Sequence, residues 1–111
     1  MGMTKLKTDI EKLAKQELER GIKYYGPHTS VHQAYAVLKE ELEEAEFEKR
    51  SVDIFMEYVW NSVKADTLDR MPEELGVIEC HLSNQIAESI QALAMVYKFK
   101  DYLEELDGSK E

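Results

Sequence analysis

The chain has few of the residues that interrupt helices or cross-link a fold. It contains two prolines, five glycines and one cysteine in 111 residues. One cysteine excludes a disulfide within the chain, and Cys80 has no Cys or His partner at the spacing of a zinc finger. We therefore expect long uninterrupted helices, with Cys80 as a free and partly buried thiol.

Clustered basic residues and long apolar runs are also missing. The 23 acidic residues outnumber the 14 basic ones, which gives a formal net charge of −9. Surfaces that bind nucleic acids neutralise phosphates with clustered Lys and Arg, which this chain lacks. No apolar run approaches the ~20 residues that cross a bilayer, and residues 1–9 have no apolar signal core. These absences predict a cytoplasmic protein with neither a nucleic-acid nor a membrane partner.

Two helices are expected in the first half of the chain. Apolar residues between Leu6 and Tyr25 recur at three- and four-residue steps, which is the stripe of an amphipathic helix. This helix should end at Gly26-Pro27. The next three residues, His28-Thr29-Ser30, offer side chains that cap helix N-termini, so a second helix is expected from about Val31 to Arg50.

Two further helices are expected in the second half. Ser51 can cap a short helix over residues 52–63, where apolar residues have helical spacing. Pro72 suits the first turn of a last helix that continues from Glu73 to about Leu106. The length of the chain suits one domain, residues 1–111. The predicted fold class is therefore all-α, a small helical bundle of about four helices in a single domain.

The last expected helix is apolar on almost every side between Ile86 and Phe99. A helix without a polar face is buried on several sides. One chain of 111 residues can hardly surround such a helix. We therefore expect a homo-oligomer, a dimer or a tetramer, assembled through this helix.

Carboxylates gather on one side of the second expected helix, whose apolar stripe comprises Val31, Ala34, Leu38, Leu42 and Ala45. At about 100° per residue, Glu40, Glu41 and Glu44 fall within an arc of about 100°, with Glu41 at the edge of the stripe. Three carboxylates in one patch repel one another unless a cation lies among them, and magnesium takes oxygen ligands of this kind. The alternative is a solvated acidic face, which is expected for Glu43, Glu46 and Glu48.

A second acidic position lies in the apolar part of the last helix. Glu88 is costly in such surroundings unless it is paired or bound to a metal ion. His81, Asn84, Gln91 and Met95 share its side of the helix, and facing polar strips of this kind form metal sites inside helix bundles. The alternative is a Glu88 that hydrogen-bonds Asn84, Gln91 or a neighbouring helix. His81 is expected to be a polar neighbour, because magnesium prefers oxygen ligands.

Three segments together resemble the MazG-like all-α nucleoside triphosphate pyrophosphohydrolases, and in particular their short, phage-associated branch. They are residues 26–30 (GPHTS), 35–45 (YAVLKEELEEA) and 87–98 (AESIQALAMVYK). The resemblance covers roughly residues 25 to 100. It implies that carboxylates of a Glu-Glu-x-x-Glu element and a Glu-x-x-Asp element hold magnesium ions, with manganese as an alternative, against the phosphates of a nucleoside triphosphate.

Residue by residue, the resemblance places Glu40, Glu41 and Glu44 in the first element and Glu88 at the start of the second. Gln91 stands where the family has Asp, and its amide oxygen can ligate magnesium without bringing a charge. The implied reaction is attack of water between the α- and β-phosphates, which releases pyrophosphate and a nucleoside monophosphate. Metal ions neutralise charge on the phosphoryl oxygens, and Glu41 or Glu44 is the candidate general base.

Other polar and aromatic side chains have two readings each. Lys98 lies two turns beyond Gln91 on nearly the same side, so it either contacts a phosphate of the bound nucleotide or is a solvated charge. Trp60 is a stacking platform or, as we favour, a core or interface residue. Two roles are possible for Tyr24, Tyr25, His28 and His32: they line a pocket for the nucleotide base, or they have a structural role. The alternative to an enzyme is a non-catalytic helical assembly or nucleotide-binding module. Gln91 favours this alternative, because it stands where the resemblance implies an Asp that ligates the metal.

Overall fold

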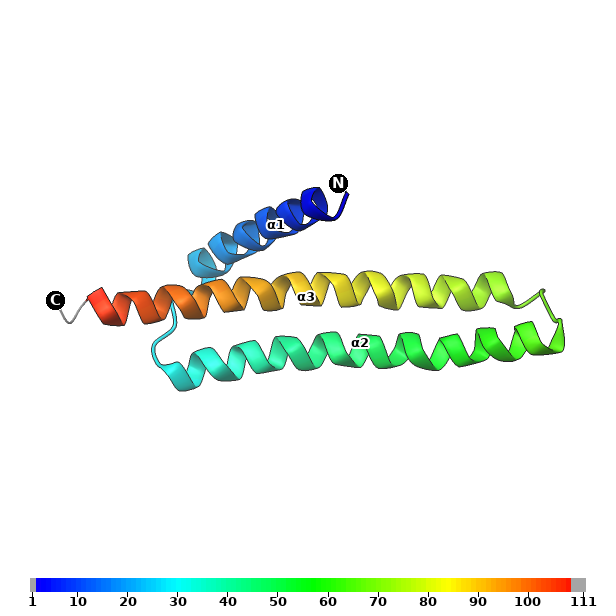
Figure 1. Ribbon diagram of the computed structural model, residues 1–111. Helices are drawn as coiled ribbons and strands as arrows, with labels where there is room; N and C mark the ends of the chain where they lie inside the picture. The colour runs from blue at the N-terminus through cyan, green and yellow to red at the C-terminus, as the bar shows by residue number, and fades with distance from the viewer. Residues whose placement is uncertain (1, 109–111) are drawn as a thin grey trace. The chain divides into compact units, whose positions relative to one another are not determined.

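The computed structural model describes residues 2–108, and this part of the chain is all-helical (Figure 1). Three helices follow one another: α1 spans Gly2–Tyr25, α2 spans Val31–Ala65 and α3 spans Met71–Gly108. No β-strand occurs within residues 2–108. The predicted all-α class is confirmed. Among the described helices, none combines the length and apolar character needed to cross a bilayer.

The expected break between a second and a third helix is not found, so the described chain has three helices where about four were predicted. Helix α2 runs continuously through Ser51. The Ser51 hydroxyl donates to the carbonyl oxygen of Phe47, 3.4 Å away and one turn earlier. A serine that bonds back in this way lets the helix continue. Residues 31–65 also contain neither Pro nor Gly to interrupt it.

The predicted boundary between α1 and α2 is confirmed. Gly26 has a φ of 74°, the left-handed conformation that commonly ends a helix, and its N–H donates to the carbonyl of Ile22 at 2.8 Å. Ser30 is the N-cap of α2, because its Oγ accepts from the N–H of Gln33 at 3.0 Å. The Gln33 side chain reaches back and accepts from the N–H of Thr29 at 2.7 Å. Local side-chain chemistry therefore fixes this turn.

The second turn links α2 to α3. Asp66 ends α2 with a φ of 58°, and the N–H of Thr67 donates to the carbonyl of Ser62 at 3.0 Å. Pro72 lies in the first turn of α3, as predicted, where its missing N–H has no helical partner to lose. Glu74, also in this turn, accepts a 3.0 Å hydrogen bond from the buried Ser62 hydroxyl. The end of α2 and the start of α3 are thereby tied together.

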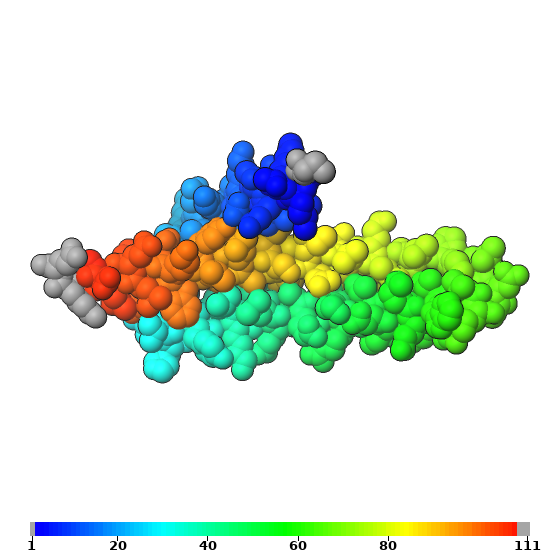
Figure 2. Space-filling model, viewed as in Figure 1, coloured from blue at the N-terminus to red at the C-terminus, as the bar shows by residue number. Residues whose placement is uncertain are grey.

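The helices contribute to two compact units. The first unit comprises Met1–Leu42 and Ser89–Glu111, and so contains α1, the beginning of α2 and the end of α3. Figure 2 shows α1, in blue, lying against the orange part of α3. The second unit, Glu43–Glu88, is an antiparallel pair made by the rest of α2 and the beginning of α3 (Figure 1).

Small side chains make up most of the buried apolar core. In the first unit the buried apolar residues are Ala14, Ala34, Ala92 and Ala94. In the second unit they are Ala45 and Ile78. No large side chain among residues 2–108 is fully buried. Alanine at these positions lets neighbouring helices approach closely, but it leaves the larger apolar side chains on the surface of the chain.

Trp60, which was expected in the core or at an interface, is exposed in the chain, and so are three other residues. Trp60 is 57% exposed, and its ring lies beneath Lys64, whose Nζ is 5.6 Å from the ring centroid. Tyr24 and Tyr25 are also exposed. The thiol of Cys80 is free, as expected, but exposed, not partly buried. Each of these side chains therefore remains largely accessible to solvent.

Candidate metal centre

Helix α2 presents Glu41 on its inner side. The positions that are buried or half-buried between residues 34 and 45 of α2 are Ala34, Val37, Leu38, Glu41 and Ala45. Steps of three and four residues relate most of these positions, as expected for one face of a helix. Leu42, which was expected in the apolar stripe, is 54% exposed, so the stripe passes through Glu41. A carboxylate therefore occupies a position that the helix would otherwise give to an apolar side chain.

Three of the predicted carboxylates converge. One oxygen from each of Glu41, Glu44 and Glu88 lies within 4.8 Å of the others. Glu41 and Glu44 are one turn apart on α2, and Glu88 comes from α3. Glu41 and Glu88 are half-buried and Glu44 is exposed. The negative charges of three carboxylates at this separation repel one another unless a cation lies among them.

The donor set fits a hard divalent cation. Magnesium binds oxygen ligands in an octahedron, in which neighbouring oxygens are about 3.0 Å apart and opposite ones about 4.2 Å apart. Three oxygens within 4.8 Å of one another must therefore draw closer to hold one ion, which rotations of the three glutamate side chains allow. The exposure of Glu44 leaves one side of the cluster open. Water and phosphate oxygens, which usually complete a magnesium site, have access from that side.

The other acidic residues of α2 behave differently from one another. Glu40 is exposed and is not one of the three clustered carboxylates. Glu43 and Glu46 are exposed, as expected for a solvated face. The expectation for Glu48 is wrong, because its side chain is only 18% exposed and its Oε2 lies 2.6 Å from Nδ1 of His81. The His81 ring stacks on Phe55, with centroids 6.4 Å apart.

Gln91 is held by a residue that sequence reasoning missed. Its Nε2 donates to Oε1 of Glu17 on α1 at 3.3 Å. Glu17 also pairs with Arg20, whose Nη2 is 2.7 Å from Oε2. In the sequence, Glu17 stands three residues after the buried Ala14, on the inner stripe of α1, and an acidic residue in such a stripe is the signal that could have identified it. A carboxylate thus lies beside the side-chain amide of Gln91.

Lys98 and His28 are both buried, which contradicts the solvated reading of Lys98. Burial lowers the pKa of the Lys98 ammonium from its ordinary value of 10.5. The pKa of His28 is also lowered, chiefly by burial and then by the positive charge of Lys98, while a hydrogen bond with Gln33 acts in the opposite direction. His32 is exposed, so the two histidines of this segment have different environments.

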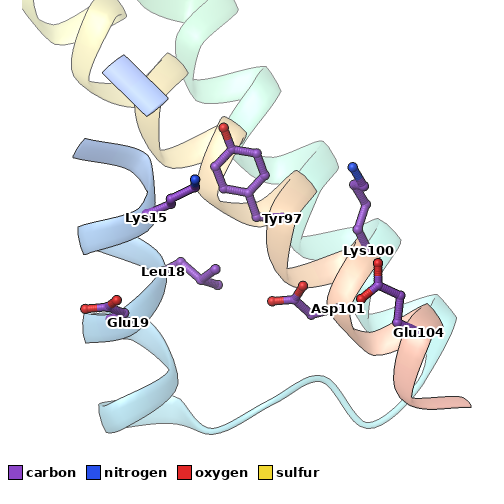
Figure 3. A pocket seen from close by; sticks show the side chains of 7 residues that line it. All are labelled: Lys15, Leu18, Glu19, Tyr97, Lys100, Asp101 and Glu104. Carbon is purple, nitrogen blue, oxygen red and sulfur yellow. The ribbon is translucent and has the colours of Figure 1, made fainter. Parts of the chain in front are cut away.

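A separate cavity of about 330 Å³ lies in the first unit between α1 and α3 (Figure 3). Figure 3 shows Leu18 of α1 and Asp101 of α3 pointing into the space between the two helices. The residues that line it are Lys15, Leu18, Glu19, Tyr97, Lys100, Asp101 and Glu104. None of the predicted site residues is among them. Its mixed charges give no preference for a ligand of one sign.

Comparison of the chain with protein-family models, curated proteins and solved structures finds no match. The resemblance to the MazG-like enzymes therefore stays a prediction that rests on the three sequence segments. The convergence of Glu41, Glu44 and Glu88 is an independent observation, because it depends on how the helices place these side chains.

Proposed function

We propose that the protein is a magnesium-dependent nucleoside triphosphate pyrophosphohydrolase that converts a (deoxy)nucleoside triphosphate into the monophosphate and pyrophosphate. The observation that carries this proposal is the convergence of Glu41, Glu44 and Glu88 from two helices. Manganese, which also prefers oxygen ligands, is the alternative cation. Glu40 and Gln91 are proposed as further ligands on the same two helices, as the family resemblance implies.

In the proposed reaction, water attacks between the α- and β-phosphates. Bound magnesium supplies charge neutralisation at the phosphoryl oxygens and lowers the pKa of a coordinated water. Glu41 or Glu44 accepts the proton of the attacking water, and Lys98 contacts a phosphate. Glu44 is the more accessible of the two carboxylates, whereas Glu41 is held on the inner face of α2. These environments favour Glu41 as a fixed ligand and Glu44 as the base.

The test is release of pyrophosphate from a panel of nucleoside triphosphates in the presence of magnesium. Glu41→Gln and Glu88→Gln should each abolish release while helicity, measured by circular dichroism, is retained. Glu46→Gln is the matched control, because Glu46 is an exposed acid of the same helix. Failure of the wild-type protein across the panel, with its helicity intact, would refute the proposal.

We also propose that the chain assembles into a homo-oligomer, a dimer or a tetramer, through α3. The accessible surface of the chain is 8472 Å². A typical folded monomer of 12.9 kDa exposes about 6,300 Å². The excess of roughly 2,000 Å² is more than twice the area of about 800 Å² that each partner hides in a standard interface. Sedimentation equilibrium tests this, and a strict monomer at micromolar concentration would contradict it.

A second candidate is a module that binds nucleotide without hydrolysing it. The observation in its favour is that the Gln91 amide already bonds Glu17, in a position where the family has an Asp. Isothermal titration calorimetry separates the two, because tight magnesium-linked nucleotide binding without pyrophosphate release identifies the binding module. A large gain of activity in Gln91→Asp would show that the native site lacks a charge that catalysis needs.

A further inference from the structure

Two basic side chains of the first unit are buried, and the positive charge of Lys98 acts on His28. His28, in the turn between α1 and α2, is 5% exposed, and Lys98 of α3 is 9% exposed. The His28 ring meets Tyr102 edge to face, with centroids 6.4 Å apart and planes at 88°. Tyr102 lies one turn after Lys98 on α3, so both α3 side chains face the turn that carries His28.

Although the His28 ring has a hydrogen bond with Gln33, one of its nitrogens lacks a partner, and so does the Lys98 ammonium. Nε2 of His28 is buried and accepts or donates no hydrogen bond. Within residues 2–108, Lys98 makes no hydrogen bond or ion pair. Buried polar groups in proteins are nearly always bonded, and a buried charge is costly without a counter-charge. The first turn of α2, whose N-terminus carries a partial positive charge, begins three residues after His28.

We propose that His28 and Lys98 bind a phosphate group, and that in the reaction proposed above this is a phosphate of the triphosphate chain. A phosphate suits the pair better than a single carboxylate, because it brings about two negative charges and several acceptor oxygens to two donors. The two donors and the helix N-terminus give one locally positive site in a chain whose net charge is −9.

The position of Lys98 along α3 agrees with this use. Lys98 follows Gln91 by seven residues, which is a rise of about 10 Å along the helix. Side chains on a helix lean toward its N-terminus, so Lys98 leans toward Gln91. A triphosphate chain that is held by the carboxylates through magnesium at one phosphate can therefore extend toward Lys98 with another. This substrate assignment rests on the proposed function, whereas binding of phosphate by the pair does not.

The test is titration of the wild-type protein with tripolyphosphate in EDTA, without magnesium. Calorimetry measures the binding, and the ring-proton chemical shifts of His28 as a function of pH measure its pKa with and without tripolyphosphate. We expect saturable binding that raises the pKa of His28, since a bound anion stabilises the imidazolium. Lys98→Met should weaken binding by about tenfold or more, because a charge-assisted hydrogen bond is lost, and Lys98→Arg should retain part of it. Lys100→Met is the control, because Lys100 is exposed two residues away.

Equal effects of Lys98→Met and Lys100→Met, or an unchanged His28 pKa at saturation, would overturn the phosphate-binding pair. If Lys98→Met releases pyrophosphate from triphosphates with unaltered kcat and KM, the substrate assignment fails while the proposed function stands. If tripolyphosphate binds to the pair but no triphosphate is hydrolysed, the proposed function fails and the pair is confirmed as a site for free phosphate chains. The His28 measurement uses the wild-type protein, so it decides the matter even if a variant folds poorly.

Discussion

The substitution Glu88→Gln should change the stability of the protein in opposite directions with and without magnesium. It removes one of three carboxylates whose oxygens lie within 4.8 Å of one another. At that separation, repulsion between two unit charges is about 0.9 kcal/mol in water and about 3.5 kcal/mol at an effective dielectric constant of 20. Glu88 is half-buried and Glu44 is exposed, so the lower part of this range applies. Without magnesium, the free energy of unfolding of Glu88→Gln should therefore exceed that of the wild-type protein by about 1 kcal/mol.

In magnesium the order of stability should reverse, so that the wild-type protein is more stable than Glu88→Gln. A ligand that binds only the folded state stabilises it by RT ln(1 + [L]/Kd), which is about 1.4 kcal/mol at ten times Kd. The wild-type protein should show this gain, and Glu88→Gln should lose most of it. Urea unfolding followed by circular dichroism, in EDTA and in magnesium, measures all four values. A variant that is destabilised in EDTA, or that keeps the full magnesium effect, would refute the electrostatic reasoning; Glu46→Gln corrects for the general loss of one negative charge.

Three other substitutions test separate parts of the molecule. The pKa of His28 is lowered in the folded chain, so the unfolded chain binds more protons there as the pH falls below about 6.5. The free energy of unfolding should therefore decrease as the pH falls from 6.5 through the lower pKa of the folded state. Wild-type protein should thus lose more stability than His28→Gln between pH 7.5 and 5.5 in urea unfolding, and equal losses would contradict this. Ser30→Ala removes the N-cap of α2 and should cost about 1 kcal/mol of unfolding free energy, measured against Ser51→Ala, whose hydroxyl caps nothing. Glu17→Gln should weaken magnesium binding about tenfold in calorimetry, as expected for a residue that orients a ligand, and an unchanged affinity would show that Glu17 is purely structural.

The helix boundaries that were predictable are those that neighbouring residues determine. Gly26, Ser30 and Pro72 act through their own backbone conformation or through bonds to residues within one turn, so the sequence pattern was sufficient. The predicted break at Ser51 failed because a serine that caps a helix in one context bonds back to a carbonyl in another. Residue type alone does not distinguish these two cases.

The candidate site was predictable where it depends on spacing along one helix. Glu41 and Glu44 are one turn apart, and the apolar surroundings of Glu88 marked it as unusual. The predicted apolar stripe of α2 was displaced by one residue. It included Leu42, which is exposed, and left Glu41 at the edge of the stripe. The bond between Glu17 and Gln91 joins residues 74 positions apart, and the burial of His28 and Lys98 depends on the packing of different helices. No local pattern contains that information.

The alanines that fill the first unit also determine which changes in side-chain volume it can accept. Ala34, Ala92 and Ala94 have no side chain beyond Cβ, so shortening them to glycine removes one carbon and opens only a small void. A larger residue there has no space to enter and must push neighbouring helices apart, because packed interiors respond to added volume by displacing the backbone. Selection on this chain should therefore act mainly against enlargement at its buried positions, while many of its large apolar side chains remain free to vary until a partner covers them.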